Sequence, residues 1–290
     1  MADRIVITGA AGQVGRFLAD EASRQGREVL ACASSQWDIT DPGAAERIVE
    51  PGDIVVNCAA YTAVDAAETD EARAHAVNAA GAGNVARACA QVGARLIHVS
   101  TDYVFGGAFP AGPRPYEIDD PTGPRSVYGR TKLAGEQAVH AALPEAHVVR
   151  TSWVYTAAGS DFVATMRRLA AGDGPVSVVA DQIGSPTYVA DLVAALLQVA
   201  DGGIAAPLLH AANGGAVSRF EQARAVFEGI GADPQRVQPV GSDQHPRPAP
   251  RPPYSALSAR QSAAAGLTPL RPWRDALAAA LAAQAAPRQS

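Results

Sequence analysis

The sequence predicts an α/β protein with a Rossmann-like, doubly wound parallel sheet and a smaller C-terminal lobe. A glycine-rich turn near the N-terminus lies directly between a β-branched run and a helical pattern. Further apolar runs alternate with helical patterns, which favours parallel strands joined by crossover helices. These runs lie at residues 28–32, 53–60, 95–100 and 146–150. We expect residues 1–160 to form the main domain and residues 161–290 mainly a substrate-binding lobe, with some segments returning to the main sheet.

The composition limits the classes of protein to which this chain can belong. The chain has 290 residues, 48% hydrophobic and 18% charged, enough for a main domain and a lobe with real cores. The net charge is -5 and no basic block occurs, so we expect neither nucleic acid nor a membrane as partner. No signal segment and no apolar run of about 18 residues occur, which predicts a soluble cytoplasmic protein. Cys32, Cys58 and Cys89 lack CxxC spacing and are predicted to be reduced thiols without zinc.

The first element is a strand, a glycine turn and a helix. Residues 4–8 form a β-branched run, and Gly9, Gly12 and Gly15 follow before apolar residues continue at helical spacing. These glycines allow a tight turn and close approach of the backbone to a pyrophosphate, which would lie at the helix N-terminus. A plain strand-to-helix turn is the alternative, but this context favours a dinucleotide site.

The end of the second strand, at residues 28–32, usually distinguishes the nicotinamide cofactors. NAD-specific sites carry an acid about 20 residues after the glycines, which bonds the ribose 2′-hydroxyl. Ser34 and Ser35 stand there instead, with no carboxylate to repel a 2′-phosphate and no arginine to hold one. We therefore predict NADPH, with NADH tolerated. Asp38 is a candidate adenine contact, or else a cap for the helix that starts near residues 41–42.

The third strand, at residues 53–60, is almost continuously apolar and ends in small residues, which would let a cofactor lie close. The loop at 61–65 follows at the same rim of the sheet. Asn78 lies in an alanine-rich helical stretch, residues 76–92. Its amide is either a surface or capping group, or a polar anchor for a proton relay.

The fourth strand, at residues 95–100, ends in hydroxyl side chains. Ligands of open α/β sheets gather beyond the carboxyl ends of strands, so Ser100 and Thr101 are expected to face the site. His98 lies within the strand and is interpreted as a packed core or interface histidine. A loop rich in Gly and Pro, residues 106–125, follows, and long loops of this kind are often lids.

Tyr128 and Lys132 are four residues apart, which places both side chains on one face of a helix. An ammonium close to a phenol lowers the tyrosine pKa from its usual value of about 10. Such a phenol can give a proton to a carbonyl oxygen as a hydride arrives. This pair alone occurs by chance on many helices, so the prediction depends on the glycines and hydroxyls upstream.

The last strand of the main domain, at residues 146–150, leads to Trp153. This ring either stacks on a planar ligand or a sugar face, or packs in the core, and the sequence leaves both open. Beyond residue 160 we predict helices at 162–171, 188–199 and 273–283 and a strand at 176–179.

A proline-rich segment at residues 245–255 carries Arg247 and Arg251. It is either a polyproline spacer or a stiff loop that presents these arginines to the phosphates of a substrate.

Three motifs stand together in order: Gly9-xx-Gly12-xx-Gly15, Ser100-Thr101-Asp102 and Tyr128-xxx-Lys132. This set resembles the extended short-chain dehydrogenase/reductase family. The surrounding residues resemble its dTDP-4-dehydrorhamnose reductase branch over nearly the whole chain. These residues are 12–15, 57–65, 100–105, 127–136 and 150–155, with 181–187 and 251–255 fitting too. The resemblance implies NAD(P)H-dependent reduction of the C4 ketone of dTDP-4-dehydro-L-rhamnose to dTDP-L-rhamnose, the last step of dTDP-rhamnose synthesis.

The resemblance also implies roles for single residues. Tyr128 matches the acid, Lys132 the residue that binds the nicotinamide ribose, and Thr101 the hydroxyl that polarises the ketone. The cofactor-binding set is Gly9, Gly12, Gln13, Val14, Gly15, Asp38, Ile39, Ala60, Tyr61, Thr62, Ser100, Tyr128 and Lys132. The substrate-binding set is Thr101, Asp102, Trp153, Arg251 and Ser255.

The chain departs from the family in two places. Some members dimerise through a magnesium site built from glutamates, but here Arg16 and Phe17 follow Gly15. We therefore predict no required metal and a monomer or weak homodimer. Tyr61 stands where the family often carries histidine.

Two alternatives to this activity stay open. One is a dTDP-4-keto-6-deoxyhexose reductase of a natural-product sugar pathway, because sequence does not show how loops read the sugar. The other is a non-catalytic relative that acts as a regulatory subunit, since a fold alone does not fix a function.

Overall fold

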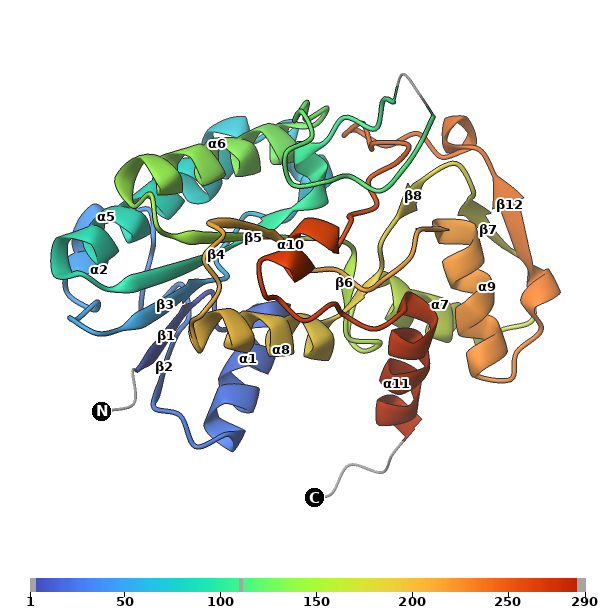
Figure 1. Ribbon diagram of the computed structural model, residues 1–290. Coiled ribbons are helices and arrows are strands. Elements are labelled where there is room, and N and C mark those ends of the chain that lie inside the picture. Colours follow the sequence, from blue (N-terminus) through green and yellow to red (C-terminus); the bar gives the residue numbers. More distant parts are fainter. Residues whose placement is uncertain (1–3, 110–111, 286–290) are drawn as a thin grey trace.

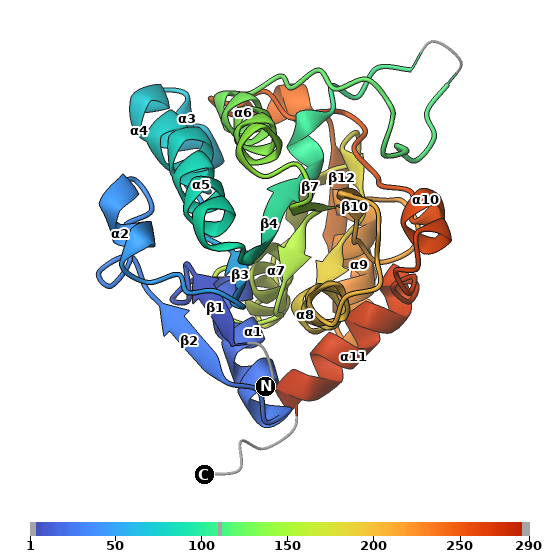
Figure 2. The same ribbon diagram turned by 60° about the vertical axis from the view of Figure 1, so that its left-hand side comes forward.

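The computed structural model describes residues 4–109 and 112–285 (Figure 1). It confirms the predicted α/β class, because a six-stranded parallel sheet lies at the centre with helices on both faces (Figure 2). The strands run across the sheet in the order β10-β5-β4-β3-β1-β2. Their bounds are β1 Ile5–Thr8, β2 Val29–Cys32, β3 Ile54–Asn57, β4 Arg95–Thr101, β5 His147–Thr151 and β10 Leu208–His210.

The strands of the sheet are buried on both faces, which explains their nearly continuous apolar sequence. In β1, Ile5 and Ile7 belong to the core on one face and Val6 to the core on the other, since successive side chains alternate. The chain leaves β1 for β2 on one side and then returns to β3 on the other. Ligands of such sheets bind at this switch point, beyond the carboxyl ends of the strands.

Helices cover the two faces in separate layers (Figure 2). Helices α1 and α8 share a core with one face, and α2, α5 and α6 share a core with the other. The stretch predicted as one helix at 76–92 begins with a wider π-helical segment, η1, and continues as α5. The bounds are α1 Gln13–Arg24, α2 Pro42–Glu46, α3 Val64–Ala67, α4 Glu71–His75, η1 Ala76–Gly81, α5 Ala82–Val92, η2 Asp102–Val104, α6 Val127–Ala142 and α8 Val189–Ala200.

The rest of the chain builds the C-terminal lobe from short strand pairs and helices. The pairs are β6 Val154–Tyr155 with β9 Thr187–Tyr188, β7 Val176–Val179 with β12 Val237–Val240, and β8 Ile183–Gly184 with β11 Val217–Ser218. The helices are α7 Phe162–Ala170, α9 Arg219–Gly229, η3 Pro234–Arg236, η4 Ser242–Gln244, α10 Arg260–Ala264 and α11 Trp273–Ala285. The predicted helices at 162–171, 188–199 and 273–283 and the predicted strand at 176–179 are present with small shifts of their ends.

The two halves of the chain share one core. Strand β10 joins the edge of the main sheet beside β5, although it comes after residue 160. One continuous apolar cluster reaches from Leu18 of α1 through Leu192 of α8 to Phe227 of α9 and Leu277 of α11. The lobe is therefore packed onto the sheet through α8 and is not joined to it by a linker.

The loop at 106–125, compared with lids in the sequence, packs against the C-terminal segment in its described parts. The ring of Tyr116 stacks on Phe105 with 4.0 Å between ring centroids, and its backbone N–H donates to the Ala256 carbonyl at 2.8 Å. No described residue of this loop lines the large cavity at the switch point. In the described part of the chain, no helix combines the length and apolar character needed to cross a bilayer.

Candidate active site

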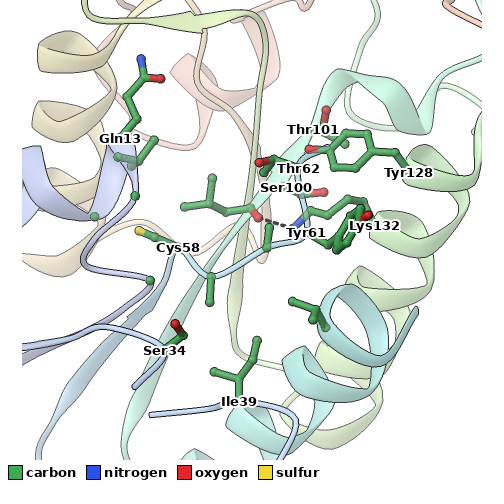
Figure 3. A pocket seen from close by; sticks show the side chains of 18 of the residues that line it. Gln13, Ser34, Ile39, Cys58, Tyr61, Thr62, Ser100, Thr101, Tyr128 and Lys132 are labelled. Carbon is green, nitrogen blue, oxygen red and sulfur yellow. Dashed lines mark hydrogen bonds between the residues drawn. The ribbon is translucent and has the colours of Figure 1, made fainter. Parts of the chain in front are cut away.

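A cavity of about 980 Å³ opens at the carboxyl ends of β1, β3 and β4, at the switch point of the sheet (Figure 3). Several parts of the sequence line it: the turn after β1, the residues after β2 and after β3, helix α4 with η1, the end of β4, helix α6, and the residues from the end of β5 to the start of β6. The structure brings most predicted site residues to its wall. They are Gly9, Gly12, Gln13, Val14, Gly15, Asp38, Ile39, Ala60, Tyr61, Thr62, Ser100, Thr101, Asp102, Tyr128, Lys132 and Trp153.

The glycine turn forms the first wall. Gly9 has a left-handed backbone with φ of 64°, and a Cβ there would lie 2.7 Å from the backbone of Ala59. A Cβ on Gly15 would lie 2.9 Å from Ala10 Cα. Helix α1 starts after Gly12 with no side-chain cap and no acid in its first turn, so its first N–H groups lack a side-chain acceptor. This helix end therefore fits the pyrophosphate of a dinucleotide.

Asp38 lies at the far end of the same cavity. Its carboxylate accepts from the Thr40 hydroxyl at 2.7 Å and from the Thr40 N–H at 2.9 Å, which lowers its pKa. The alternative role as a helix cap is wrong, because Asp41 caps α2 by accepting from the Gly43 N–H. The adenine contact stays a prediction.

Asn78 is buried and braces the loop after β3 against α6. Its Oδ1 accepts from the Tyr61 N–H at 2.8 Å, and its Nδ2 donates to Thr131 Oγ1 at 3.0 Å. The interpretation as a surface amide is therefore wrong. Its use in a proton relay is not tested by these contacts.

Tyr128 and Lys132 both face the cavity from α6 (Figure 3). Burial raises the pKa of the Tyr128 phenol, and a hydrogen bond with Thr101 opposes this shift. The expectation that Lys132 lowers this pKa is wrong for this structure, because burial dominates and Lys132 Nζ bonds elsewhere. It donates to the Val99 carbonyl at 2.7 Å and lies 3.3 Å from His98 Nε2.

His98 is buried within β4, as the sequence predicted, but its contacts were not predicted. Its Nδ1 lies 3.1 Å from Asn57 Nδ2, and its Nε2 faces Lys132. Burial lowers the pKa of His98 well below the usual value, and the charge of Lys132 acts in the same direction. Burial also lowers the pKa of Lys132 to about 8, while Glu136 and Cys58 act to raise it.

Asp102 is the hydrogen-bond acceptor for three hydroxyls beside the cavity. Its carboxylate accepts from Ser255 at 2.5 Å, from Ser152 at 2.9 Å and from Thr101 at 3.1 Å. Burial raises the pKa of Asp102, and these three hydroxyls oppose the shift. Ser255, predicted as a substrate contact, does not line the cavity and instead fixes Asp102 from the C-terminal segment.

Trp153 lines the cavity with an unusual backbone and a clamped ring. Its φ of 46° is in the left-handed region, which is rare for a non-glycine residue. A Cβ on Gly184 of β8 would lie 2.5 Å from the indole. The guanidinium of Arg219, at the start of α9, lies 3.5 Å from the ring centroid. Trp153 thus packs against the lobe, as one alternative predicted, and also borders the cavity. Its stacking on a ligand or a sugar face stays a prediction.

Arg251 pairs with Asp65 through its guanidinium and also donates to the Ala249 carbonyl at 2.7 Å. It does not line the cavity, so its contact with a substrate phosphate stays a prediction. Sequence reasoning missed Arg73, Cys58 and Ser152 in the wall, and Arg219 behind it. Ser152 stands next to Trp153 and could have been found from that motif, whereas nothing near Arg219 in the sequence signals its role.

No group of three His, Cys, Asp or Glu side chains lies close enough to hold a metal ion within residues 4–109 and 112–285.

Comparison with known proteins agrees with this geometry. A family model described as the RmlD substrate binding domain matches residues 3–286. The dTDP-4-dehydrorhamnose reductase of Mycobacterium tuberculosis is 69% identical over 285 residues, covering 98% of this chain and 94% of that protein. The enzyme of the same name from Mycolicibacterium smegmatis is 66% identical over 284 residues, covering 98% and 86%. A dTDP-4-dehydrorhamnose reductase from Bacillus anthracis, solved in complex with NADP, has a TM-score of 0.89 at 37% identity, covering 96% and 98%.

Proposed function

We propose, because the chain belongs to the RmlD substrate binding domain family, that it reduces the C4 ketone of dTDP-4-dehydro-L-rhamnose with NADPH and forms dTDP-L-rhamnose. One observation carries the proposal. Thr101 at the end of β4 and the pair Tyr128 and Lys132 on α6 border one cavity that also contains an uncapped helix end. The family membership and the names of relatives at 66% and 69% identity support the same substrate.

The cavity wall divides into a cofactor end and a sugar end. When bound, NADPH supplies the hydride. The first turn of α1, with Gly12, Gln13 and Val14, would hold the pyrophosphate, and Asp38 and Ile39 would border the adenosine. Ala60, Tyr61 and Thr62 border the nicotinamide side. Ser34 and Ser35 also line the cavity and leave room for a 2′-phosphate without a carboxylate.

Tyr128 is the proton donor in this proposal. As a hydride reaches C4, the ketone oxygen gains negative charge, and the phenol transfers its proton to that oxygen. A raised pKa keeps the phenol protonated at neutral pH, so Tyr128 carries the proton that it donates before the hydride arrives. The resulting phenolate must then recover a proton before the next turnover.

Thr101 supplies a second hydroxyl beside Tyr128. Its Oγ1 accepts from the Tyr103 N–H at 3.2 Å and donates to Asp102 at 3.1 Å, which fixes its place at the end of β4. When the substrate is bound, this hydroxyl turns its single proton from Asp102 to the ketone oxygen, which polarises the ketone and stabilises the developing alkoxide. Asp102 and Trp153 border the sugar, and Arg251 is proposed to meet the diphosphate after leaving Asp65.

Purified protein with NADPH and dTDP-4-dehydro-L-rhamnose tests this function. We expect loss of NADPH absorbance and one new product, dTDP-L-rhamnose, identified by NMR. A panel of other dTDP-4-keto-6-deoxyhexoses is the control for substrate class. Turnover of a panel member with no oxidation in the presence of the rhamnose precursor would reject the substrate. NADPH binding without any reduction, together with a stable hetero-complex, would instead favour a regulatory subunit.

A further inference from the structure

Lys132 is the only lysine in the sequence, and every other member of the 24 Lys and Arg residues is arginine. The two side chains differ in one chemical respect that matters here. An arginine stays charged in proteins, whereas a buried lysine can lose its proton and become a neutral amine. The chain thus keeps its single lysine amine at a buried position in the wall of the candidate active site.

The orientation of the Asn57 amide follows from its donors. Asn57 Oδ1 lies 3.1 Å from the Ala59 N–H, which can only donate, and 2.7 Å from the Thr8 hydroxyl. Turning the amide over would bring two N–H groups together at Ala59. Asn57 Nδ2 therefore faces His98 Nδ1, at 3.1 Å, as a donor.

The tautomer of His98 follows from this orientation. Because Asn57 Nδ2 donates, His98 Nδ1 must accept and carries no proton. A neutral imidazole then has its proton on Nε2. The ring is buried and has a pKa well below the usual value, so the doubly protonated form is excluded near neutral pH. His98 Nε2 consequently presents an N–H to Lys132 Nζ, 3.3 Å away.

Among the residues that the structure describes, Lys132 Nζ has one clear acceptor. Strand β3 pairs with β4 only as far as Asn57 and His98, so the next carbonyl of β4, at Val99, has no partner strand on that side. Nζ donates to this carbonyl at 2.7 Å. An ammonium in this place would point a further N–H at the N–H of His98. An amine fits both contacts, because it donates to Val99 and accepts from His98.

We propose that His98, held by Asn57 with its proton on Nε2, is a positioning residue that favours the neutral amine of Lys132 in the free protein. When a ligand offers oxygen acceptors to Nζ, the side chain leaves His98 and takes up one proton from solvent. The ligand hydroxyls would be those of the nicotinamide ribose, so this second step rests on the proposed function.

The other titratable groups around Nζ do not explain why the neutral amine of Lys132 would be favoured. Glu136, one turn further along α6, is neutralised by Arg150, with contacts of 2.7 and 2.9 Å. The pKa of the Cys58 thiol, beyond β3, is raised to about 12 by burial, so this group is neutral. The Tyr128 phenol on α6 and His140 near His98 remain. Neither makes a hydrogen bond to Nζ among the described residues.

NMR on protein labelled with ¹³C and ¹⁵N in lysine and histidine tests the inference. The single lysine gives one side-chain signal, which can be titrated without assignment. We expect Lys132 to titrate at or below about 8, far from the usual value of about 10.4. We also expect His98 to show the tautomer with the proton on Nε2. A proton on Nδ1, or an ordinary Lys132 pKa, would overturn the proposal.

Two variants distinguish the effect of the His98 N–H donor on the Lys132 pKa from the effect of burial. Asn57→Asp places a carboxylate opposite Nδ1, so the proton should move to Nδ1, and Nε2 should then accept from the ammonium. The Lys132 pKa should rise by at least one unit, although the added charge contributes to the rise. His98→Gln adds no charge, can turn its amide oxygen toward Nζ, and should also raise the pKa. An unchanged Lys132 pKa in a folded His98→Gln protein would reject the role of His98.

His147→Gln is the matched control, because His147 lies on β5 and bonds the Ala206 carbonyl. The Lys132 pKa in the His147→Gln protein should equal that in the unaltered protein. NADPH binding then tests the second step through the number of protons taken up at pH 8 to 9. We expect the dissociation constant to rise as the pH rises through this window, since the free protein must gain a proton. NADPH binding with no proton uptake would reject this step, whereas absence of any NADPH binding would reject the cofactor assignment instead.

Discussion

The cofactor end and the sugar end of the cavity are built in different ways. At the cofactor end, Gly9, Gly12 and Gly15 lie within seven residues, and a Cβ added at each of them would lie close to backbone atoms. At the sugar end, Asp102 depends on Ser255, which is 153 residues away, and Trp153 depends on Gly184 and Arg219. The cofactor end is therefore built from residues that are close together in the sequence. The sugar end, in contrast, forms only when the C-terminal lobe packs against the sheet.

Tyr128→Phe is the change that should affect neither end and still stop the reaction. Loss of the proton donor should lower turnover by ~10²–10⁴-fold. The dissociation constants of NADPH and of the dTDP-sugar product should change little, because the ring and its burial are kept. Steady-state kinetics and equilibrium binding measure both quantities. Near-normal turnover in this variant would remove Tyr128 from the mechanism.

Gly15→Ala should damage the cofactor end alone. A Cβ there would meet backbone atoms of Gly9 and Ala10, which cannot turn away as a side chain can. Overpacking of this kind costs about 1–3 kcal/mol, so the NADPH dissociation constant should rise roughly 10–100-fold. Fluorescence titration with NADPH measures this dissociation constant. The affinity for the dTDP-sugar product should not change. Gly174→Ala is the control, because no atom lies within 4 Å of its added Cβ.

Gly184→Ala is the counterpart at the sugar end. Its Cβ would lie 2.5 Å from Trp153 Cε2, so the indole must move. The effect should be smaller than at Gly15, roughly 10-fold in KM for the sugar, because a side chain can shift where backbone cannot. NADPH affinity should stay the same. A change in NADPH affinity equal to the change in KM would show that the two ends are not separate.

Arg219→Met should have the smallest effect. Stacking of a guanidinium on a tryptophan is worth about 1 kcal/mol, so KM for the sugar should rise roughly 5-fold. Methionine keeps an apolar cover on the ring, and the stability of the fold should change little. The fluorescence of Trp153, compared with that of Trp153→Phe, reports whether the ring has moved. An unchanged KM would show that Gly184 holds the indole without help.

The part of the site that sequence predicts is the part whose geometry is local. The glycine turn, the strand ends and the Tyr128–Lys132 spacing follow from helix and strand periodicity. The resemblance implied the single residues, and most of these line the cavity. The direction of the Tyr128 pKa was wrong because burial depends on the whole fold. The contacts of His98 and Arg219 were missed because their partners come from other elements.

The prediction of the fold from the sequence is limited in the same way. Strands β1, β3 and β4 were predicted from β-branched or apolar runs, while β10 is only three residues and gains its place by pairing with β5. The bond from the Ser255 hydroxyl to Asp102 was not predicted, and the contact of Ser255 with the substrate stays a prediction. Short segments and lone serines carry too little information for such placements, which are decided by packing.

The continuous core through α8 has a consequence for how this protein can be cut or recombined. A fragment that stops near residue 160 would leave the α1 face of the sheet open to water, because α8 and Leu192 would be missing. Grafting the lobe of another reductase onto this sheet would require the matching α8 as well. Point changes around Trp153 leave this core intact and should therefore disturb the fold less than an exchange of halves.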